Sequence, residues 1–292
     1  VDYASWKAMG IRPARMLDEP EEAETDENQL PQTSLVQAIQ QEFLQSLDVT
    51  AKDVSDFLHL PQRYADGRAH QRWLSARQNR LTASRFGSAC AAHGTRKSRK
   101  AAVLEMLTLP EGRPQQAARF GVQHEEVARK AYVAWRREAM TAKTVNLQIQ
   151  ALGLCVWREE PWLAASPDGL CVLDGVPEGL LEIKTSPSWN EMFDGELPVD
   201  WTYQVNGCIK VASQALGQEL HWCDLFLWTP KRQRCRRMLF DEELWQRAMF
   251  PELRHFFFDC FLPEAVERER QRRQRIAKQR HKNNRRSRQK KR

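Results

Sequence analysis

Three residues in the stretch AASPDGLCVLDGVPEGLLEIKT (residues 164–185) could carry out chemistry if the chain brought them together. Side chains on a β-strand alternate between two faces, so Glu182 and Lys184 point one way and their apolar neighbours point the other way. If LCVL and LLEIKT pair as a hairpin, Asp168 at its mouth can approach Glu182. Two carboxylates and one ammonium group would then share a pocket.

Such a pocket suits a metal ion. Two neighbouring carboxylates repel each other, and a hard divalent cation such as Mg²⁺, with Mn²⁺ as a substitute, removes that conflict because it prefers oxygen ligands. The cation can polarise a phosphodiester and lower the pKa of a bound water. A lysine beside it can orient that water and stabilise the developing negative charge. Glu125, on an amphipathic segment at 121–138, is the candidate third acid. The pattern predicts metal-dependent phosphodiester hydrolysis.

The same residues also have an ordinary structural interpretation. SPDG is a good β-turn, because proline fixes φ and aspartate bonds the local backbone. A glutamate and a lysine on one face of a strand often form its solvated side. A single D…ExK match leaves both interpretations open.

Charge is distributed unevenly along the 292 residues. Residues 264–292 contain fourteen Lys or Arg and three Glu, a net charge of +11; since the whole chain carries +7, the first 263 residues carry −4. At the other end, residues 18–27 hold seven acids in ten positions, too little apolar surface to fold, so we expect disorder there. The basic tail is expected to be disordered or helical. It is either a neutral solvated extension or a segment for nucleic-acid contact and nuclear import.

Composition also excludes several classes of protein. The seven cysteines form no CxxC pair and no cluster with zinc spacing, and their odd number argues against a disulfide framework. No run approaches eighteen apolar residues, and the first thirty residues lack a signal-peptide core. We therefore expect no membrane partner and no secretion, but a reducing compartment: the nucleus, or otherwise the cytoplasm.

Apolar periodicity predicts a mixed α/β domain between two extensions. We divide the chain into a partly disordered acidic extension with short helices (1–60), a main domain (69–263) and the basic tail (264–292). The elements expected are two short helices within 33–60, helices over 82–94, 121–138 and 201–216, a meander of WLAA, LCVL and GLLEIKT, a hairpin around TPKRQR, and a C-terminal helix pair interrupted at Pro251.

Five segments, in order, resemble the motifs of the lambda-type exonuclease, or YqaJ viral recombinase, family of the PD-(D/E)xK nuclease superfamily. They are WLSARQNRLTAS, RFGVQHEEVARKAY, ASPDGL, LLEIKT and TYQVNG, and they lie within residues 73–228, just over half of the chain. Five matches in the family's order are far more specific than any single one.

The resemblance implies a central mixed β-sheet flanked by helices, in the manner of a restriction-endonuclease-like core. It implies that Asp168 and Glu182 are metal ligands, with the backbone carbonyl of Ile183 as a further ligand. Glu125 would be a third acid near the metals. Lys184 would be the water-orienting base or an electrostatic catalyst.

Three further residues take roles from the same resemblance. Gln204 would be a positioning group near the lysine. Arg77 and Ser84 would bind the 5′-phosphate of a strand end, and a guanidinium fork with a hydroxyl is a good phosphate clamp. Two ordinary explanations stay open: Arg77 is one of many surface arginines, and Ser84 is a helix cap.

The implied activity is a Mg²⁺-dependent deoxyribonuclease that degrades duplex DNA from its ends, 5′ to 3′, in recombination or in viral or mobile-element DNA processing. The implied partners are double-stranded DNA ends, a single-strand annealing or recombination protein, and further copies of the chain. Because the first 263 residues are net negative, DNA contact is expected from local clusters at 96–100 and 231–237, helped by the tail. An endonuclease of the same superfamily and a non-catalytic DNA-binding or partner-recruiting module remain alternatives.

Overall fold

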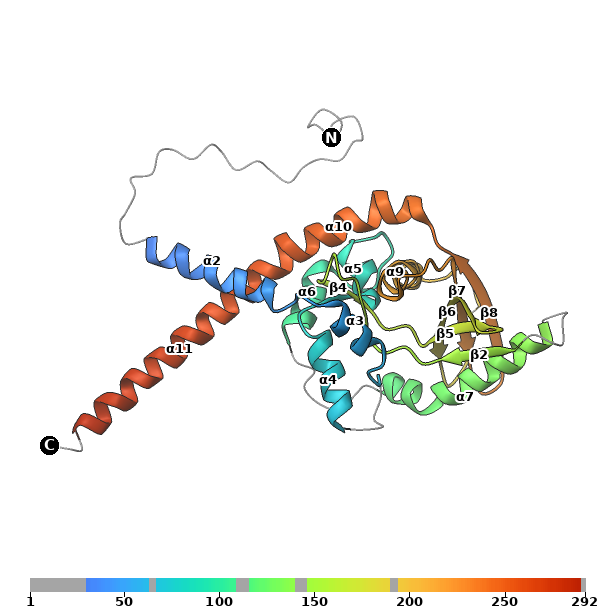
Figure 1. The fold of residues 1–292 in the computed structure, drawn as a ribbon, viewed down its shortest axis with the longest axis horizontal. Helices are drawn as coiled ribbons and strands as arrows, with labels where there is room; N and C mark the ends of the chain where they lie inside the picture. Colours follow the sequence, from blue (N-terminus) through green and yellow to red (C-terminus); the bar gives the residue numbers. More distant parts are fainter. Residues whose placement is uncertain (1–29, 63–66, 109–115, 140–145, 190–193, 290–292) are drawn as a thin grey trace, which may run out of the picture.

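The computed structural model describes residues 30–62, 67–108, 116–139, 146–189 and 194–289. The predicted acidic segment at 18–27 lies outside them. In the described part, two β-sheets and their flanking helices form a body from which the long helix α11 (Leu262–Gln289) extends (Figure 1). None of the described helices is long and apolar enough to cross a bilayer.

A five-stranded mixed sheet carries the residues predicted to do chemistry. Its strands, in spatial order, are β2 (Leu147–Gln150), β5 (Gly169–Leu173), β6 (Val176–Thr185), β7 (Trp222–Trp228) and β8 (Gln233–Leu239). Only β6 and β7 are parallel neighbours; the other pairs are antiparallel, including the hairpin predicted around TPKRQR. Parallel neighbours need a crossover, which the predicted helix α9 (Val199–Leu216) provides.

The predicted hairpin between β5 and β6 is confirmed. Its two-residue turn is Asp174-Gly175, with φ of 48° and 84°. Positive φ at both turn residues gives a connection whose twist matches that of the flanking strands. The hairpin register pairs Gly169 with Leu181, so the residue before β5 is delivered to the middle of β6.

The first strand of the predicted meander belongs to a different sheet. β4 (Leu163–Ala165) lies between β1 (Leu81–Thr82), which is parallel to it, and β3 (Cys155–Val156), which is antiparallel. All three residues of β4 are buried, and a short buried strand carries no local signal of which strand it pairs with. The SPDG turn therefore connects two sheets, and Asp168 lies at their junction.

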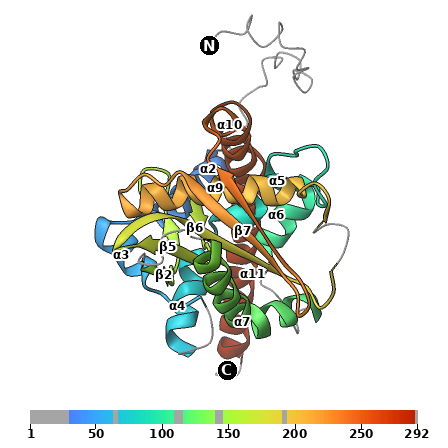
Figure 2. The ribbon, with the colours of Figure 1, turned by 90° about the vertical axis from the view of Figure 1, so that its right-hand side faces the viewer.

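The two faces of the large sheet are covered by different helices (Figure 2). Leu181 and Ile183 pack against Ala128 and Tyr132 of α7 (Gln116–Ala139), the predicted amphipathic helix. Leu180 lies in the main core with residues of α9. Because side chains alternate along β6, Glu182 and Lys184 share the α9 face with Leu180, as the sequence predicts.

A buried ion-pair network fixes α7 on the sheet. Asp224 of β7 is 2% exposed and accepts hydrogen bonds from Tyr132 Oη at 2.8 Å and from Arg237 Nε and Nη2 at 2.8 and 2.9 Å. Arg136, one turn after Tyr132, lies 3.9 Å from the same carboxylate. Burial, with the charges of Cys171 and Asp224, raises the pKa of Tyr132, so its hydroxyl stays a neutral donor.

The helices before the main sheet follow the predictions in part. The two helices expected within 33–60 are confirmed as α2 (Leu30–Gln45) and α3 (Ala51–Leu58), and α2 packs on α11 through Ile39. They are followed by α4 (Gly67–Arg77) and, later, α6 (Arg99–Leu107).

The helix predicted over 82–94 is shorter than expected. Leu81–Thr82 enters β1, a 3₁₀ turn η1 (Ala83–Arg85) follows, and α5 (Phe86–Ala89) ends before Ala91, which has φ of 49°. A left-handed residue at this position ends a helix in the same way as a C-terminal cap.

The helix break predicted at Pro251 is wrong, because residues 244–289 are helical throughout. The chain passes from a π-helical segment, η2 (Leu244–Met249), to α10 (Phe250–His255), then through a second π segment, η3 (Phe256–Phe261), into α11. Pro251 and Pro263 each stand second in the α segment that follows a π segment. The wider π turn accommodates a residue that has no N–H and whose ring would clash with an α-helical turn.

Replacing Asp224 by Ala should destabilise the protein markedly, because Arg237 and Arg136 lose their shared counter-charge. We expect a loss at the lower end of the roughly 3–5 kcal/mol typical of broken buried pairs, since Arg237 keeps some solvent contact. Urea unfolding followed by tryptophan fluorescence measures it. The control is Glu243→Ala, which removes an exposed ion pair with Arg247 worth at most about 1 kcal/mol. Equal effects of the two substitutions would contradict the role given to Asp224.

Candidate active site

Glu182, Lys184 and Gln204 form a closed triangle of hydrogen bonds. Lys184 Nζ donates to Glu182 Oε1 at 2.8 Å and to Gln204 Oε1 at 2.9 Å, and Gln204 Nε2 donates to Glu182 Oε1 at 2.6 Å. The first two residues come from β6 and the third from α9, the helix that covers their face. The parallel β6-α9-β7 crossover therefore positions all three.

Asp168 lies beside the same part of β6. Its Oδ2 accepts a hydrogen bond from the backbone N–H of Ile183 at 2.6 Å, which holds the end of the SPDG turn against the strand. Burial lowers the pKa of Lys184, but the charge and hydrogen bond of Glu182 and the charge of Asp168 outweigh it, so the net shift is upward. The lysine is thus held as an ammonium group next to two carboxylates.

One oxygen of this site lacks a partner. Glu182 is 4% exposed, and its Oε2 is buried with no hydrogen-bond partner among the described residues. A buried carboxylate oxygen normally has a partner, and a divalent cation would supply one. The candidate metal ligands here are this Glu182 oxygen, the Asp168 carboxylate and the Ile183 carbonyl. All of them are oxygen atoms, and such a set fits Mg²⁺ or Mn²⁺.

Glu125 lies on α7, the helix that covers the opposite face of the sheet from α9. It stands one turn after Gly121, where an added Cβ would lie 3.5 Å from Thr185 Oγ1 at the end of β6. Its side chain is 12% exposed, and its Oε1 accepts a hydrogen bond from Arg129 Nη2 at 3.1 Å. No three His, Cys, Asp or Glu side chains of the described ranges gather with metal-binding geometry. The role of Glu125 as a third acid stays a prediction.

Arg77, at the end of α4, is surrounded by hydroxyl groups. It donates to Ser166 Oγ at 3.2 Å and makes longer contacts of 3.4 Å with Thr82 Oγ1 and Ser84 Oγ, and its guanidinium lies 4.9 Å from the centre of the Trp73 ring. It is half-buried and bonded, unlike a freely solvated surface arginine. Ser84 lies inside η1, whose N-terminus has no side-chain cap, so the helix-cap explanation fails.

This hydroxyl cluster adjoins the carboxylates. Burial, then the neighbouring charge of Arg85, lowers the pKa of Arg77 to about 10, while the charge of Glu182 acts in the opposite direction. Ser166 is two residues before Asp168 in the same turn. A guanidinium ringed by hydroxyls, beside acids that suit a cation, matches the needs of a phosphate group bound next to a metal.

Four residues of the site were missed in the sequence. Ser166 and Thr82 bind Arg77, and Arg85 Nη1 donates to Thr82 Oγ1 at 2.9 Å. Trp201 lies beside Lys184, whose Nζ is 5.7 Å from the centre of the Trp201 ring. Trp201 stands three residues before Gln204 on a predicted helix, and residues with this spacing lie on one helix face, so the sequence could have placed Trp201 near the site.

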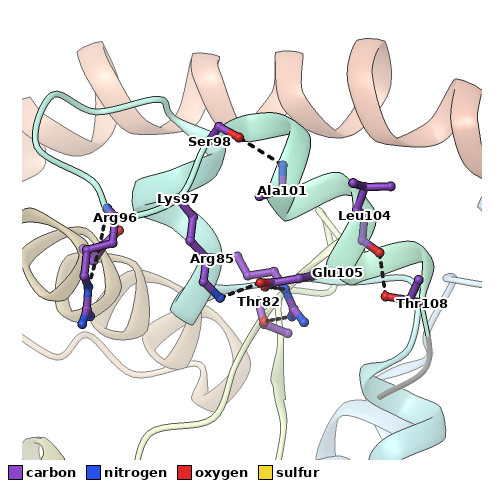
Figure 3. Close-up of polar contacts among 10 residues, drawn as sticks. Thr82, Arg85, Arg96, Lys97, Ser98, Ala101, Leu104, Glu105 and Thr108 are labelled. Carbon is purple, nitrogen blue, oxygen red and sulfur yellow. Dashed lines mark hydrogen bonds and ion pairs between the residues drawn. The ribbon is translucent and has the colours of Figure 1, made fainter. Parts of the chain in front are cut away.

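Several residues of the two basic clusters expected to contact DNA bind acidic or carbonyl oxygens of the same chain. Arg96 Nε lies 3.3 Å from Asp200 Oδ2, and Lys97 Nζ lies 2.6 Å from Glu105 Oε1 (Figure 3). In the cluster at 231–237, four arginines bind acidic or carbonyl oxygens of residues 194, 195 and 224. These pairings reduce the positive charge that either cluster offers to a DNA backbone.

Comparison with known proteins agrees with the resemblance seen in the sequence. Residues 72–215 match the family model described as the YqaJ-like viral recombinase domain. An alkaline exonuclease, LHK-Exo from Laribacter hongkongensis, is 22% identical with a TM-score of 0.52, and the match covers 70% of this chain and 99% of that one. Its complex with dAMP matches over the same shares at 22% identity and a TM-score of 0.53. No curated protein sequence matches the chain.

The structural likeness establishes the fold that the sequence predicts, a mixed sheet flanked by helices. The family match covers Arg77, the SPDG turn, β6 and most of α9, which together carry the two clusters described above. Residues 72–215, just under half of the chain, are thus similar in sequence to the YqaJ-like viral recombinase domain.

Proposed function

We propose that this protein is a metal-dependent deoxyribonuclease that hydrolyses duplex DNA from its ends in the 5′ to 3′ direction. The observation that carries the proposal is the adjacency of two clusters: Glu182 with its unpartnered oxygen, bound to Lys184 and Gln204, and Arg77 ringed by hydroxyls. The first suits a divalent cation and the second suits a phosphate. The family match and the alkaline exonuclease activity named for LHK-Exo support the assignment.

Asp168, Glu182 and the backbone carbonyl of Ile183 would hold Mg²⁺ or Mn²⁺, with Glu125 as a further acid. Bound there, the ion supplies positive charge that polarises a phosphodiester and makes a nearby water easier to deprotonate. Lys184 orients the attacking water and stabilises the negative charge that develops on the phosphate. Gln204 bridges Lys184 and Glu182 and so fixes the direction of the ammonium group.

The hydroxyl-lined arginine would set where the strand is cut. With a terminal 5′-phosphate bound by Arg77, Ser84 and Ser166, the next phosphodiester of the strand is the one that can reach the carboxylates. Water attacks this phosphorus and the bond to the 3′-oxygen breaks, which releases a nucleoside 5′-monophosphate. The shortened strand again ends in a 5′-phosphate, so the same clamp can bind it for the next round.

The wider setting follows from the resemblance and from the charge of the tail. We propose double-stranded DNA ends as the substrate, a single-strand annealing or recombination protein as a partner, and assembly with further copies of the chain. The net charge of +11 over residues 264–292 supports nuclear import. Recombination, or the processing of viral or mobile-element DNA, is the corresponding biological role.

Lys184→Ala should lower the turnover rate roughly 10²- to 10³-fold, because one stabiliser of the transition state is lost. Asp168→Asn should lower it further, since metal binding is lost with it. Release of nucleotides from linear duplex DNA measures both, in Mg²⁺, in Mn²⁺ and in excess chelator. Lys52→Ala, an exposed lysine on α3, is the matched control and should be fully active. Activity that persists in excess chelator, or that is unchanged in Lys184→Ala, would rule out this mechanism.

End dependence has a direct test. Linear DNA with a 5′-phosphate should be degraded faster than linear DNA with a 5′-hydroxyl, and closed circular DNA should stay intact. Arg77→Gln should reduce the preference for the 5′-phosphate while the unphosphorylated substrate is cut at a similar rate. Gel electrophoresis of the three substrates measures this. Closed circles cut as fast as linear DNA would identify an endonuclease instead.

The lowered pKa of Arg77 predicts stabilisation by phosphate. Because its folded-state pKa of about 10 is below the ordinary value, the charged guanidinium destabilises the fold at every pH below about 10, and this cost fades only as the pH rises further. Thymidine 5′-monophosphate should therefore raise the melting temperature at neutral pH, because the free energy of its binding adds to the stability of the folded state. Thymidine should not, and Arg77→Gln should remove the shift. An undiminished shift in the variant would place the phosphate elsewhere.

A further inference from the structure

A groove of about 750 Å³, lined in part by Arg77, runs between α2, α4, α6 and α11. Its walls come from segments far apart in the chain, and they are held together by contacts such as the hydrogen bond from Arg268 Nη1 to the carbonyl of Leu107 at 3.0 Å. Helix α11 lies alongside α2 here before it leaves the body (Figure 1). The proposed phosphate clamp and the C-terminal helix thus share one continuous surface.

The groove is positively charged. Six arginines line it against three glutamates. The hydrogen bonds of Arg77 go to hydroxyl groups and that of Arg268 goes to a carbonyl, and neither arginine forms an ion pair within the described part of the chain. Arg85 Nε is buried without a hydrogen-bond partner among the described residues, and its nearest carboxylate, Glu105, is 3.9 Å away and also pairs with Lys97 (Figure 3). These guanidinium groups remain able to bind phosphate oxygens.

The groove lining also has an apolar part, beside uncharged polar residues such as Gln71, Ser75 and Asn79. Phe43 of α2, Leu74 of α4, and Met106 and Leu107 of α6 contribute to its lining, and Leu74 is 37% exposed. Duplex DNA presents a surface of phosphates and keeps its bases stacked inside. Apolar side chains next to arginines suit unpaired bases, whose faces pack on apolar and aromatic side chains while the backbone follows the positive charge.

The arginine row continues beyond the groove. Arg268, Arg272 and Arg275 are spaced i, i+4 and i+7 along α11, so they lie on one face of the helix. Arg275 is exposed and forms no ion pair with any described residue. A strand lying in the groove would meet this face as it leaves the body.

We propose that the groove and the Arg268–Arg275 face of α11 bind a single DNA strand that passes Arg77 without entering the carboxylate site, since the groove lining contains none of Asp168, Glu182 and Lys184. That the carboxylate site cuts DNA rests on the proposed function. Binding of the strand itself does not, since it is measurable without hydrolysis.

The test uses the full chain carrying Asp168→Asn, so that DNA is bound and not cut. Fluorescence anisotropy gives the affinity for a 5′-phosphorylated oligothymidylate of about 16 nucleotides, long enough for a typical single-strand site, and for a blunt duplex of equal length. We expect Arg268→Gln with Arg272→Gln to weaken single-strand binding. The slope of log K against log salt should become shallower by about 1.4, from roughly 0.7 per lost phosphate contact. Leu74→Gln should weaken binding with the slope unchanged.

Two controls distinguish binding in the groove from general attraction of DNA by the positive charge of α11. Lys278→Gln with Arg280→Gln removes the same charge from α11 outside the groove lining and should leave the slope nearly unchanged. Arg268→Lys with Arg272→Lys should restore binding, and thermal unfolding shows whether each variant is folded. The inference is overturned if the two Gln pairs behave alike, or if duplex affinity falls more than single-strand affinity. Strand binding without nuclease activity in the unsubstituted chain would overturn only the proposed function.

Discussion

The candidate site depends on one buried carboxylate. Glu182 has one oxygen shared by Lys184 and Gln204 and the other without a partner, in a position almost closed to solvent. An ionised carboxylate is costly to bury unless charges or hydrogen bonds surround it. The sheet and α9 supply the ammonium and the amide on one side. The second oxygen, which has no hydrogen-bond partner among the described residues, is the physical reason to expect a cation beside it.

The second constraint is the junction between the two sheets. Because β4 and β5 belong to different sheets, the SPDG turn that joins them contacts both Arg77 and β6. Ser166 at one end of the turn binds Arg77, and Asp168 at the other end binds the backbone of β6. A few consecutive residues thus set the spacing between the two halves of the site. A turn within a single sheet would serve only one of them.

The sequence was sufficient to predict those features of the fold that depend on a few adjacent residues. The alternation of β6 placed Glu182 and Lys184 on one face, and the Asp-Gly pair identified the hairpin turn, since both depend on a few adjacent residues. Pairings over long separations were not readable. β4 could not be assigned to its sheet, and Ser166 could not be linked to Arg77, because these partners lie about eighty to ninety residues apart. The helix break predicted at Pro251 was wrong because proline inside a helix is a strong sequence signal for a break, whereas no comparable sequence signal predicts a π segment in front of it.

The two π segments also determine the direction in which the C-terminal helix presents its charges. Each residue of an α-helix turns the chain by about 100°, and a π segment accommodates extra chain within a helix without ending it. Loss or gain of a single residue in η2 or η3 would therefore rotate everything downstream by about a quarter of a turn while the helix itself persisted. Short insertions and deletions in residues 244–261 are thus a simple route by which related chains could redirect the same basic extension toward a different surface.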